Sequence, residues 1–298
     1  MDINQFRSGF VALVGRPNVG KSTLLNRALG QKIAITSPKP QTTRNRILGI
    51  CHRDKAQILF LDTPGIHRPM GNKLNRYMVD QAFAVLEEVD LTLLLVEADR
   101  PAELDERIRD GLARSGRPVI LVLNKIDRIS PPELLAVIDA WRGLADFAEI
   151  VPVSALAGDN VDRLLDVVTG YLPEGPPLYP EDMVTDLPER FLVAEMIREQ
   201  VLRKLEQEIP YGVAVRVESF EEDPARDLVV IHAVIHLERE SHKRIVVGKQ
   251  GRMIRAIGAD ARKAIERLLG TRVFLHLFAR VDRNWTRSDR LLREFGYE

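Results

Sequence analysis

Short runs of hydrophobic residues recur along the first half of the chain, each four to six residues long and separated by polar stretches. They cover residues 10–14, 46–51, 58–61, 91–96, 119–123 and 150–153. Three of these runs, 58–61, 91–96 and 119–123, are nearly continuous in hydrophobicity, which is typical of strands covered on both faces in an α/β sheet. Residues 72–89 and 102–114 instead repeat apolar positions at helical spacing. The alternation predicts a largely parallel sheet, with one antiparallel pair where 46–51 meets 58–61 across a short turn.

The pattern changes after a predicted helix over Val161–Tyr171. Residues 172–180 contain four prolines and a glycine, which oppose both helix and strand hydrogen bonding. Beyond them the sequence predicts a helix over 189–206 and two strands over 213–220 and Leu228–Leu237. A helix–loop–helix, a third strand over Arg272–Val281 and a closing helix are expected to follow. We therefore expect three parts: an α/β domain over 1–172, a proline-rich linker over 173–187, and a smaller α+β domain over 188–298.

Residues 15–22 read G-R-P-N-V-G-K-S and stand between the first predicted strand and a helix. Two glycines in this setting let successive backbone N–H groups surround a phosphate, and the helix dipole adds to the positive potential. The lysine would reach the outer phosphates, and the serine hydroxyl would bind Mg2+. This is the pattern of a P-loop, so we expect a nucleotide-phosphate site formed by Gly15, Asn18, Val19, Gly20, Lys21, Ser22 and Thr23.

Two further stretches have the chemistry to complete a metal and γ-phosphate site. Asp62 ends a predicted strand in D-T-P-G, where a carboxylate can hold Mg2+ through water and the Gly65 N–H can meet a γ-phosphate. The polar loop 31–45 contains Q-T-T-R, and a threonine there would add a metal ligand that orders the loop when triphosphate binds. Thr43 is the first choice and Thr42 the second. The expected metal ligands are Ser22, Thr43 and Asp62.

The base is expected to be guanine. Asn124-Lys125-Ile126-Asp127 ends the strand at 119–123, and a carboxylate at Asp127 can accept the two N–H donors that guanine presents in one plane and adenine does not. Asn124 would support the neighbouring loop, and the Lys125 stem would cover the ring. The next strand ends in a second short motif that would offer a backbone N–H to guanine O6, consisting of Ser154, Ala155 and Leu156. An adenine-specific kinase or ATPase is thereby excluded.

A second glycine loop lies inside the predicted helix–loop–helix, in V-V-G-K-Q-G-R-M-I. Paired glycines at the start of a helix let backbone N–H groups approach nucleic-acid phosphates, while apolar side chains such as Ile254 and Ile257 would line a groove for bases. Between Ser241 and Arg293 there are fourteen Lys and Arg against four Asp and Glu, in a chain of zero net charge. We therefore expect an RNA-binding surface at Gly248, Lys249, Gln250, Gly251, Arg252, Ile254 and Arg255.

The amino-acid composition indicates the class of protein and the cellular compartment in which it acts. Hydrophobic residues make up 45% and charged residues 29% of the 298 positions, as expected for a folded chain with a substantial core. A single cysteine, Cys51, suits a reducing compartment, and no apolar run approaches the length of a membrane span. We expect a cytoplasmic protein, with peripheral association at the inner face of the cell membrane left open. No obligate protein partner is evident.

Taken in order, the motifs G-R-P-N-V-G-K-S, Q-T-T-R, D-T-P-G, N-K-I-D and S-A-L resemble those of the Era group of GTPases, and the second half resembles a type II KH domain. The resemblance covers nearly the whole chain. It implies a P-loop GTPase domain followed by a KH domain, with GTP or GDP and Mg2+ as cofactors. It further implies binding to the 3′ region of 16S rRNA and a role in 30S ribosomal subunit maturation.

Catalysis in such relatives does not use the glutamine that most signalling GTPases carry after D-x-x-G. Here that position is Ile66, which cannot orient water. Some relatives use the loop asparagine, here Asn18, to hold K+ beside the phosphates, so K+ is a further candidate cofactor. The expected catalytic groups are Lys21, Asn18 and Gly65, with slow unassisted turnover. Two alternatives stay open: a sibling GTPase acting on another RNA, and a constitutive RNA-binding protein whose nucleotide site is only structural.

Overall fold

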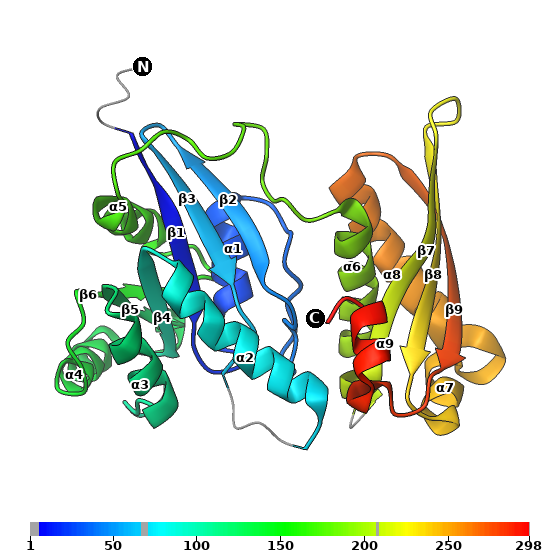
Figure 1. Cartoon of the computed structure of the whole chain (residues 1–298), viewed down its shortest axis with the longest axis horizontal. Coiled ribbons are helices and arrows are strands. Elements are labelled where there is room, and N and C mark those ends of the chain that lie inside the picture. The colour runs from blue at the N-terminus through cyan, green and yellow to red at the C-terminus, as the bar shows by residue number, and fades with distance from the viewer. Residues whose placement is uncertain (1–5, 67–70, 207–208, 298) are drawn as a thin grey trace. The chain divides into compact units, whose positions relative to one another are not determined.

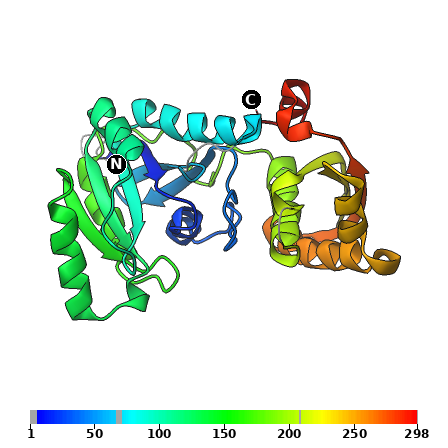
Figure 2. The ribbon, with the colours of Figure 1, turned by 90° about the horizontal axis from the view of Figure 1, so that it is seen from below.

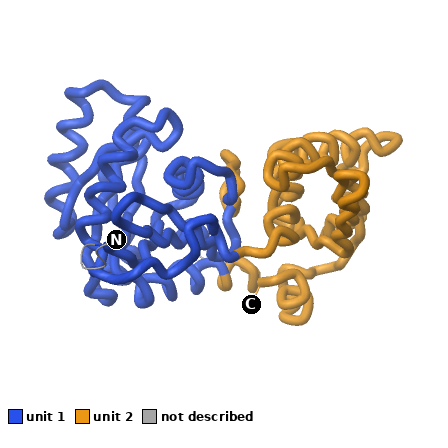
Figure 3. The backbone as a smooth tube through the Cα atoms, turned by 90° about the horizontal axis from the view of Figure 1, so that it is seen from above, with its two compact units in different colours: residues 1–34, 43–68, 78–186 blue, residues 35–42, 69–77, 187–298 orange. Residues whose placement is uncertain are grey.

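The computed structural model describes residues 6–66, 71–206 and 209–297, and the chain divides into two compact units. The first unit comprises residues 1–34, 43–68 and 78–186, and the second comprises 35–42, 69–77 and 187–298 (Figure 3). Two short segments of the first half in sequence thus belong to the second unit. Residues 1–5 and 67–70 lie outside the described residues.

The first unit is built on a six-stranded sheet in the order β2-β3-β1-β4-β5-β6. Only β2 and β3 pair antiparallel, while the other neighbours pair in parallel, which confirms the mostly parallel sheet. The parallel strands end at one edge, where the nucleotide motifs follow them. The strands are β1 (Arg7–Val14), β2 (Ile47–Arg53), β3 (Ala56–Asp62), β4 (Leu91–Glu97), β5 (Val119–Asn124) and β6 (Glu149–Val153).

Helices cover both faces of this sheet, and α1 and α2 lie on opposite faces (Figure 1). Alternate residues of the strands, such as Ala12 and Val14, pack with α2, α3 and α4 in one buried cluster. The period of two in a strand explains why every second side chain joins it. The helices are α1 (Lys21–Leu29), α2 (Lys73–Glu88), α3 (Glu106–Ser115), α4 (Pro131–Arg142) and α5 (Val161–Tyr171).

Two helices differ from the sequence expectation. The helix predicted from residue 102 begins at Glu106, because the Asp105 side chain accepts a hydrogen bond from the Arg107 N–H and caps the helix there. Helix α4 was not predicted. Its signal was present in Ser130-Pro131-Pro132-Glu133, a capping box with proline at the first helical position.

The proline-rich segment after α5 is fastened to the first unit. The side-chain oxygen of buried Gln57 accepts the N–H groups of Leu178 and Tyr179 at 2.7 and 2.9 Å, and its amide nitrogen donates to the Tyr179 carbonyl at 2.8 Å. Farther along, the Ile50 N–H donates to the Val184 carbonyl at 2.9 Å. The segment is therefore an ordered strap on this unit. The division at residues 172, 173, 187 and 188 stays a prediction.

The second unit places two long helices on one face of a three-stranded sheet in the order β7-β8-β9 (Figure 2). Strands β7 and β8 pair antiparallel, and β8 and β9 pair parallel. The α-β-β-α-α-β order is that expected of a type II KH domain. Its elements are α6 (Glu189–Lys204), β7 (Val213–Asp223), β8 (Leu228–Leu237), α7 (Glu240–Val247), α8 (Arg252–Leu269), β9 (Arg272–Val281) and α9 (Asp289–Glu294).

The closing segment around α9 has its own small core. Trp285 is fully buried, its indole N–H donates to the Gly212 carbonyl at 2.9 Å, and its ring packs against Phe295 and Tyr297. The full burial of Trp285 assigns this side chain to packing. Within the part of the chain that the structure describes, no helix combines the length and apolar character needed to cross a bilayer.

Candidate nucleotide and RNA-binding sites

Neighbouring atoms lie so close to two positions of the phosphate loop that only glycine fits there. A Cβ at Gly15 would lie 2.4 Å from the Leu95 carbonyl oxygen. A Cβ at Gly20, where φ is 105°, would lie 2.1 Å from the Asn124 side-chain nitrogen. Asn18, between them, also has positive φ, at 65°, a conformation that asparagine tolerates better than most residues. The loop can follow this path only with these small or permissive residues.

Lys21 lies at the centre of the loop. Its ammonium donates to the carbonyls of Gly15 and Arg16, both at 3.2 Å, and only 6% of the residue is exposed. Burial lowers the pKa of Lys21 to about 8, while the Asp62 carboxylate opposes that shift. A buried cation held by carbonyl oxygens is poised to exchange them for phosphate oxygens, which carry more negative charge.

Three hydroxyl and carboxylate side chains meet beside this lysine. Ser22 donates from its hydroxyl to Asp62 Oδ2 at 2.6 Å. The Thr43 hydroxyl lies 2.9 Å from the Ser22 hydroxyl and donates to the same Asp62 oxygen at 3.3 Å. Thr42 does not join them, because its hydroxyl donates to the Lys39 carbonyl at 2.6 Å. The structure therefore gathers the three residues expected to bind metal.

This cluster fits a hard divalent cation. Asp62 is fully buried, and its Oδ1 has no hydrogen-bond partner among the described residues. Burial raises the pKa of Asp62, although Lys21 and the two hydroxyl groups act against that shift. A buried carboxylate oxygen without a donor, next to two hydroxyl oxygens, is a donor set suited to Mg2+. The residues thus fit the metal that the sequence implies.

The start of the segment after β3 rests on the phosphate loop. A Cβ at Gly65 would lie 2.7 Å from the Pro17 backbone, and the Ile66 N–H donates to the Gly15 carbonyl at 3.0 Å. The Ile66 side chain is buried in the core. The position that carries a water-orienting glutamine in other GTPases is therefore part of the packing here.

The guanine motifs are joined to the phosphate loop and to each other. The Asn124 amide donates to the Val19 carbonyl at 2.7 Å and accepts the Ala155 N–H at 3.0 Å. Asp127 accepts the Ser154 hydroxyl at 2.6 Å. The strand ends of β5 and β6 thus hold the carboxylate and the Ala155 N–H on one side of the site. The Ala155 N–H is engaged with Asn124, so reaching guanine O6 requires it to share or exchange that acceptor.

Two supporting residues carried no recognisable sequence signal. Glu97, at the end of β4, forms an ion pair with Lys125, which also donates to the Asn18 carbonyl at 2.9 Å. Arg27 of α1 donates to the carbonyls of Ala155 and Leu156. Both contacts join segments that are remote in sequence, so spacing could not have revealed them.

The second glycine loop joins α7 to α8. Gly248, Gln250 and Gly251 all have positive φ, at 70°, 52° and 73°. A Cβ at Gly248 would lie 2.8 Å from the Met253 Cβ. The tight backbone path leaves the Lys249 side chain exposed at the tip of the loop, and the Arg252 side chain is exposed as well. A charged backbone turn of this kind can approach a phosphodiester closely.

The remaining residues expected at this surface differ in how far their side chains are exposed for contact with RNA. Arg255 folds back, donating to the Gly251 carbonyl at 3.2 Å and to the Gln250 carbonyl. Ile254 is half-buried beside the loop. Ile257 was expected to line the base groove, but it is fully buried in the core because it lies on the inner face of α8, so that expectation is corrected.

The fold and these two sites define a P-loop GTPase joined to a KH domain. A family model described as "50S ribosome-binding GTPase" matches residues 10–125, and a KH domain model matches residues 208–286. The GTPase Era of Geotalea uraniireducens is 58% identical and that of Geobacter metallireducens 53% identical, each over all of both chains. The chain belongs to the Era family of GTPases.

Solved structures agree with this assignment. The chain is similar to a point variant of Aquifex aeolicus Era bound to GDP·AlF4−, with a TM-score of 0.94, 43% identity and coverage of 98% of this chain and 99% of the other. It is equally similar, at a TM-score of 0.94, 43% identity and the same coverage, to Era in complex with MgGDPNP and nucleotides 1506–1542 of 16S ribosomal RNA.

Proposed function

We propose that this GTPase binds the 3′ region of 16S rRNA and assists maturation of the 30S ribosomal subunit, as a switch controlled by its nucleotide. The observation that carries the proposal is the likeness over 98% of the chain to an Era protein solved with both MgGDPNP and that RNA segment. The glycine loop at Gly248–Gly251, with Lys249 at its tip, supplies a matching surface. The family assignment disfavours a sibling GTPase acting on another RNA.

In the nucleotide site, each group is assigned by its position and chemistry. The backbone of the phosphate loop and Lys21 would bind the phosphates, Ser22, Thr43 and Asp62 would hold Mg2+, and Gly65 would meet the γ-phosphate. Mg2+ would supply charge neutralisation between the β- and γ-phosphates. Asp127 would accept guanine N–H groups, with Asn124, Lys125 and the 154–156 segment closing the base site. Lys21 would hold its proton once phosphate replaces the carbonyls, because an anion raises the pKa of a neighbouring ammonium.

A monovalent cation is part of this proposal. Ile66 cannot orient water and Asn18 stands on the exposed rim of the phosphate loop, so K+ held by Asn18 would supply positive charge to the transition state. We expect turnover to be about tenfold faster in K+ than in Na+ at equal ionic strength. The variant Asn18→Gly, which keeps the positive φ, should lose that difference. Equal rates for the wild-type protein in the two buffers would exclude K+ from the mechanism.

RNA contacts are assigned to Gly248, Lys249, Gln250, Gly251, Arg252, Ile254 and Arg255. The protein would act in the cytoplasm, where its rRNA partner is made, with peripheral contact at the membrane face as an accessory state. The parts 1–172, 173–187 and 188–298 would be the GTPase domain, its strap and the KH domain.

The RNA surface is tested by reversing charge at the loop tip. The double variant Lys249→Asp with Gln250→Asp keeps both glycines and places repelling carboxylates at the backbone turn. We expect its Kd for a 16S rRNA 3′ oligonucleotide to rise more than about tenfold at fixed salt, with unchanged GTP hydrolysis. Arg226→Asp, in the turn between β7 and β8, is the control and should bind normally. Wild-type RNA affinity in the double variant would refute this surface.

A further inference from the structure

Helix α6 buries three consecutive polar residues at its middle. Arg198 and Glu199 are fully buried, and Gln200 is 8% exposed. Charged side chains removed from water require close partners, since an unpaired buried charge is strongly unfavourable. Some partners come from α6 itself, and others come from residues 35–42, the segment of the second unit that precedes Thr43 in sequence.

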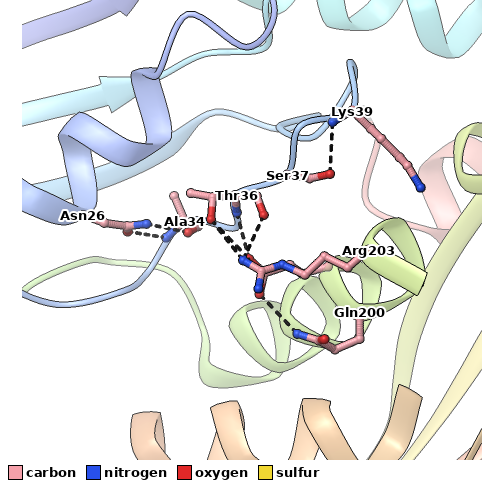
Figure 4. Close-up of polar contacts among 8 residues, drawn as sticks. Asn26, Ala34, Thr36, Ser37, Lys39, Gln200 and Arg203 are labelled. Atoms are coloured by element: carbon pink, nitrogen blue, oxygen red, sulfur yellow. Dashed lines mark hydrogen bonds and ion pairs between the residues drawn. The ribbon is translucent and has the colours of Figure 1, made fainter. Parts of the chain in front are cut away.

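Glu199 is bonded to the start of this segment. Its Oε1 accepts the Thr36 N–H at 3.0 Å and the Thr36 hydroxyl at 3.4 Å, and it pairs with Arg203 at 3.1 Å (Figure 4). Arg203 in turn donates to the Thr36 carbonyl at 3.3 Å. One carboxylate and one guanidinium thus satisfy both backbone polar groups of Thr36, which fixes the chain direction there.

Lys39 binds the carboxyl-terminal end of helix α6. Its ammonium donates to the Leu202 carbonyl at 2.5 Å and to the Leu205 carbonyl. The last carbonyls of a helix lack hydrogen-bond partners within the helix, and they carry the negative end of its dipole. A lysine ammonium there is stabilised both by hydrogen bonds to these carbonyls and by the dipole. Lys39 is therefore a side-chain cap of α6 supplied from 163 residues earlier in sequence.

Arg198 reaches the last residue of the segment. Two of its nitrogens pair with the Glu195 carboxylate at 2.6 and 2.5 Å, and one of them also donates to the Thr42 carbonyl. The peptide bond after that carbonyl leads to Thr43, the candidate metal ligand. Just before the segment, Asn26 of α1 accepts the N–H groups of Ile33 and Ala34 at 3.0 and 2.9 Å. Residues 35–42 are thus held at Thr36, Lys39 and Thr42.

We propose that Glu199 and Arg198 are positioning residues for GTP hydrolysis, because they set the path of residues 36–42 and thereby the place of the Thr43 hydroxyl. Helix α6 and residues 35–42 belong to the same unit, and residue 42 is covalently joined to Thr43. The inference rests on the proposed role of Thr43 as a ligand of the metal that accompanies the γ-phosphate. GDP lacks that phosphate, so its binding does not need the segment in this position.

The test is Glu199→Gln, which preserves size and an acceptor for Thr36 but removes the charge that holds Arg203. We expect kcat for GTP to fall and the Kd of a non-hydrolysable GTP analogue to rise, each by about tenfold. The Mg2+ concentration for half-maximal rate should also rise, whereas the Kd for GDP should stay within about twofold. A residue that only stabilised the fold would change both nucleotides alike.

Two further variants keep the test decisive. Glu189→Gln makes the same chemical change at the exposed first residue of α6 and should behave as wild type. Lys39→Met keeps the side-chain stem, leaves no buried charge, and should reproduce the selective loss for the GTP analogue even if Glu199→Gln fails to fold.

The outcomes separate this inference from the function it rests on. If Thr43→Ala selectively weakens GTP-analogue binding while Glu199→Gln and Lys39→Met leave it unchanged, the positioning role is refuted and the proposed site stands. If Thr43→Ala itself has no effect, the metal-ligand assignment fails, and the inference fails with it.

Discussion

At the residue scale, the nucleotide site depends on positions that allow no side chain. A Cβ added at Gly20 would lie 2.1 Å from the side-chain nitrogen of Asn124. The same Asn124 amide is hydrogen-bonded to the Val19 carbonyl and to the Ala155 N–H. The phosphate loop and the guanine motifs therefore form one hydrogen-bonded assembly. Space at this glycine matters as much as the chemistry of Lys21.

The variant Gly20→Ala tests this close approach. We expect it to abolish measurable GTP and GDP binding and to lower the free energy of unfolding by about 3 kcal/mol, from backbone strain together with displacement of Asn124. Gly30→Ala is the matched control, because Gly30 also has positive φ, at 64°, but an added Cβ would meet nothing within 4 Å. It should cost only about 1 kcal/mol and leave nucleotide binding intact. Equal effects in chemical denaturation and binding would contradict the account.

Much of the site could be predicted because its motifs are contiguous in sequence. Ser22 and Asp62 each carry their chemistry within a short recognisable stretch, and strand order brings them together. Thr43 was favoured over Thr42 without a firm reason, and the bond of Thr42 to Lys39 separates them only in three dimensions. Glu97 and Arg27 were missed because their partners are remote in sequence.

At the element scale, burial and capping determine which segments could be predicted. The strands of the first unit followed from continuous apolar runs, whereas α4 escaped despite its Ser130–Glu133 capping box. Helix α6 was predicted, but its buried Arg198 and Glu199 were not, because a charged pair in a helix is usually on its solvated face. The contacts of α6 with residues 36–42, together with ion pairs inside the helix to Glu195 and Arg203, explain why these charges are buried.

Strand β8 carries a pH-sensitive group. His236 is 1% exposed, and its Nδ1 lies 2.7 Å from Asp282 Oδ2. Burial lowers the pKa of His236, against the opposing effect of Asp282; Arg280 lowers it further and Glu218 raises it. Because the unfolded chain binds this proton more readily, the stabilisation is fully present above pH 6.5 and is lost as pH falls toward the folded-state pKa.

We therefore expect the free energy of unfolding to decrease between pH 7.5 and pH 5.5, measured with urea at constant ionic strength. The variant His236→Phe should show a smaller decrease over the same window, since it removes the titrating group while retaining the ring contact with Phe295. A wild-type stability that rises on acidification, or identical slopes in the two proteins, would show that His236 does not contribute in this way.

At the scale of the whole molecule, sequence order and compact units do not coincide. Residues 35–42 lie between α1 and β2 in sequence, yet they belong with α6 and the KH elements, while the next residue, Thr43, belongs with Ser22 and Asp62. The chain therefore passes directly from contacts with the RNA-binding unit to the candidate metal site. That continuity gives nucleotide state and RNA binding a covalent route of influence, and linkage requires the influence to be reciprocal.

The most direct test is the affinity for an RNA oligonucleotide equivalent to nucleotides 1506–1542 of 16S rRNA, measured by fluorescence anisotropy with saturating Mg2+ and either a non-hydrolysable GTP analogue or GDP. At fixed salt we predict that the Kd differs by about tenfold between the two nucleotide states in the wild-type protein, and that Thr43→Ala removes most of the difference. The same Kd with both nucleotides in the wild-type protein would contradict the coupling of the guanine-nucleotide site to RNA binding.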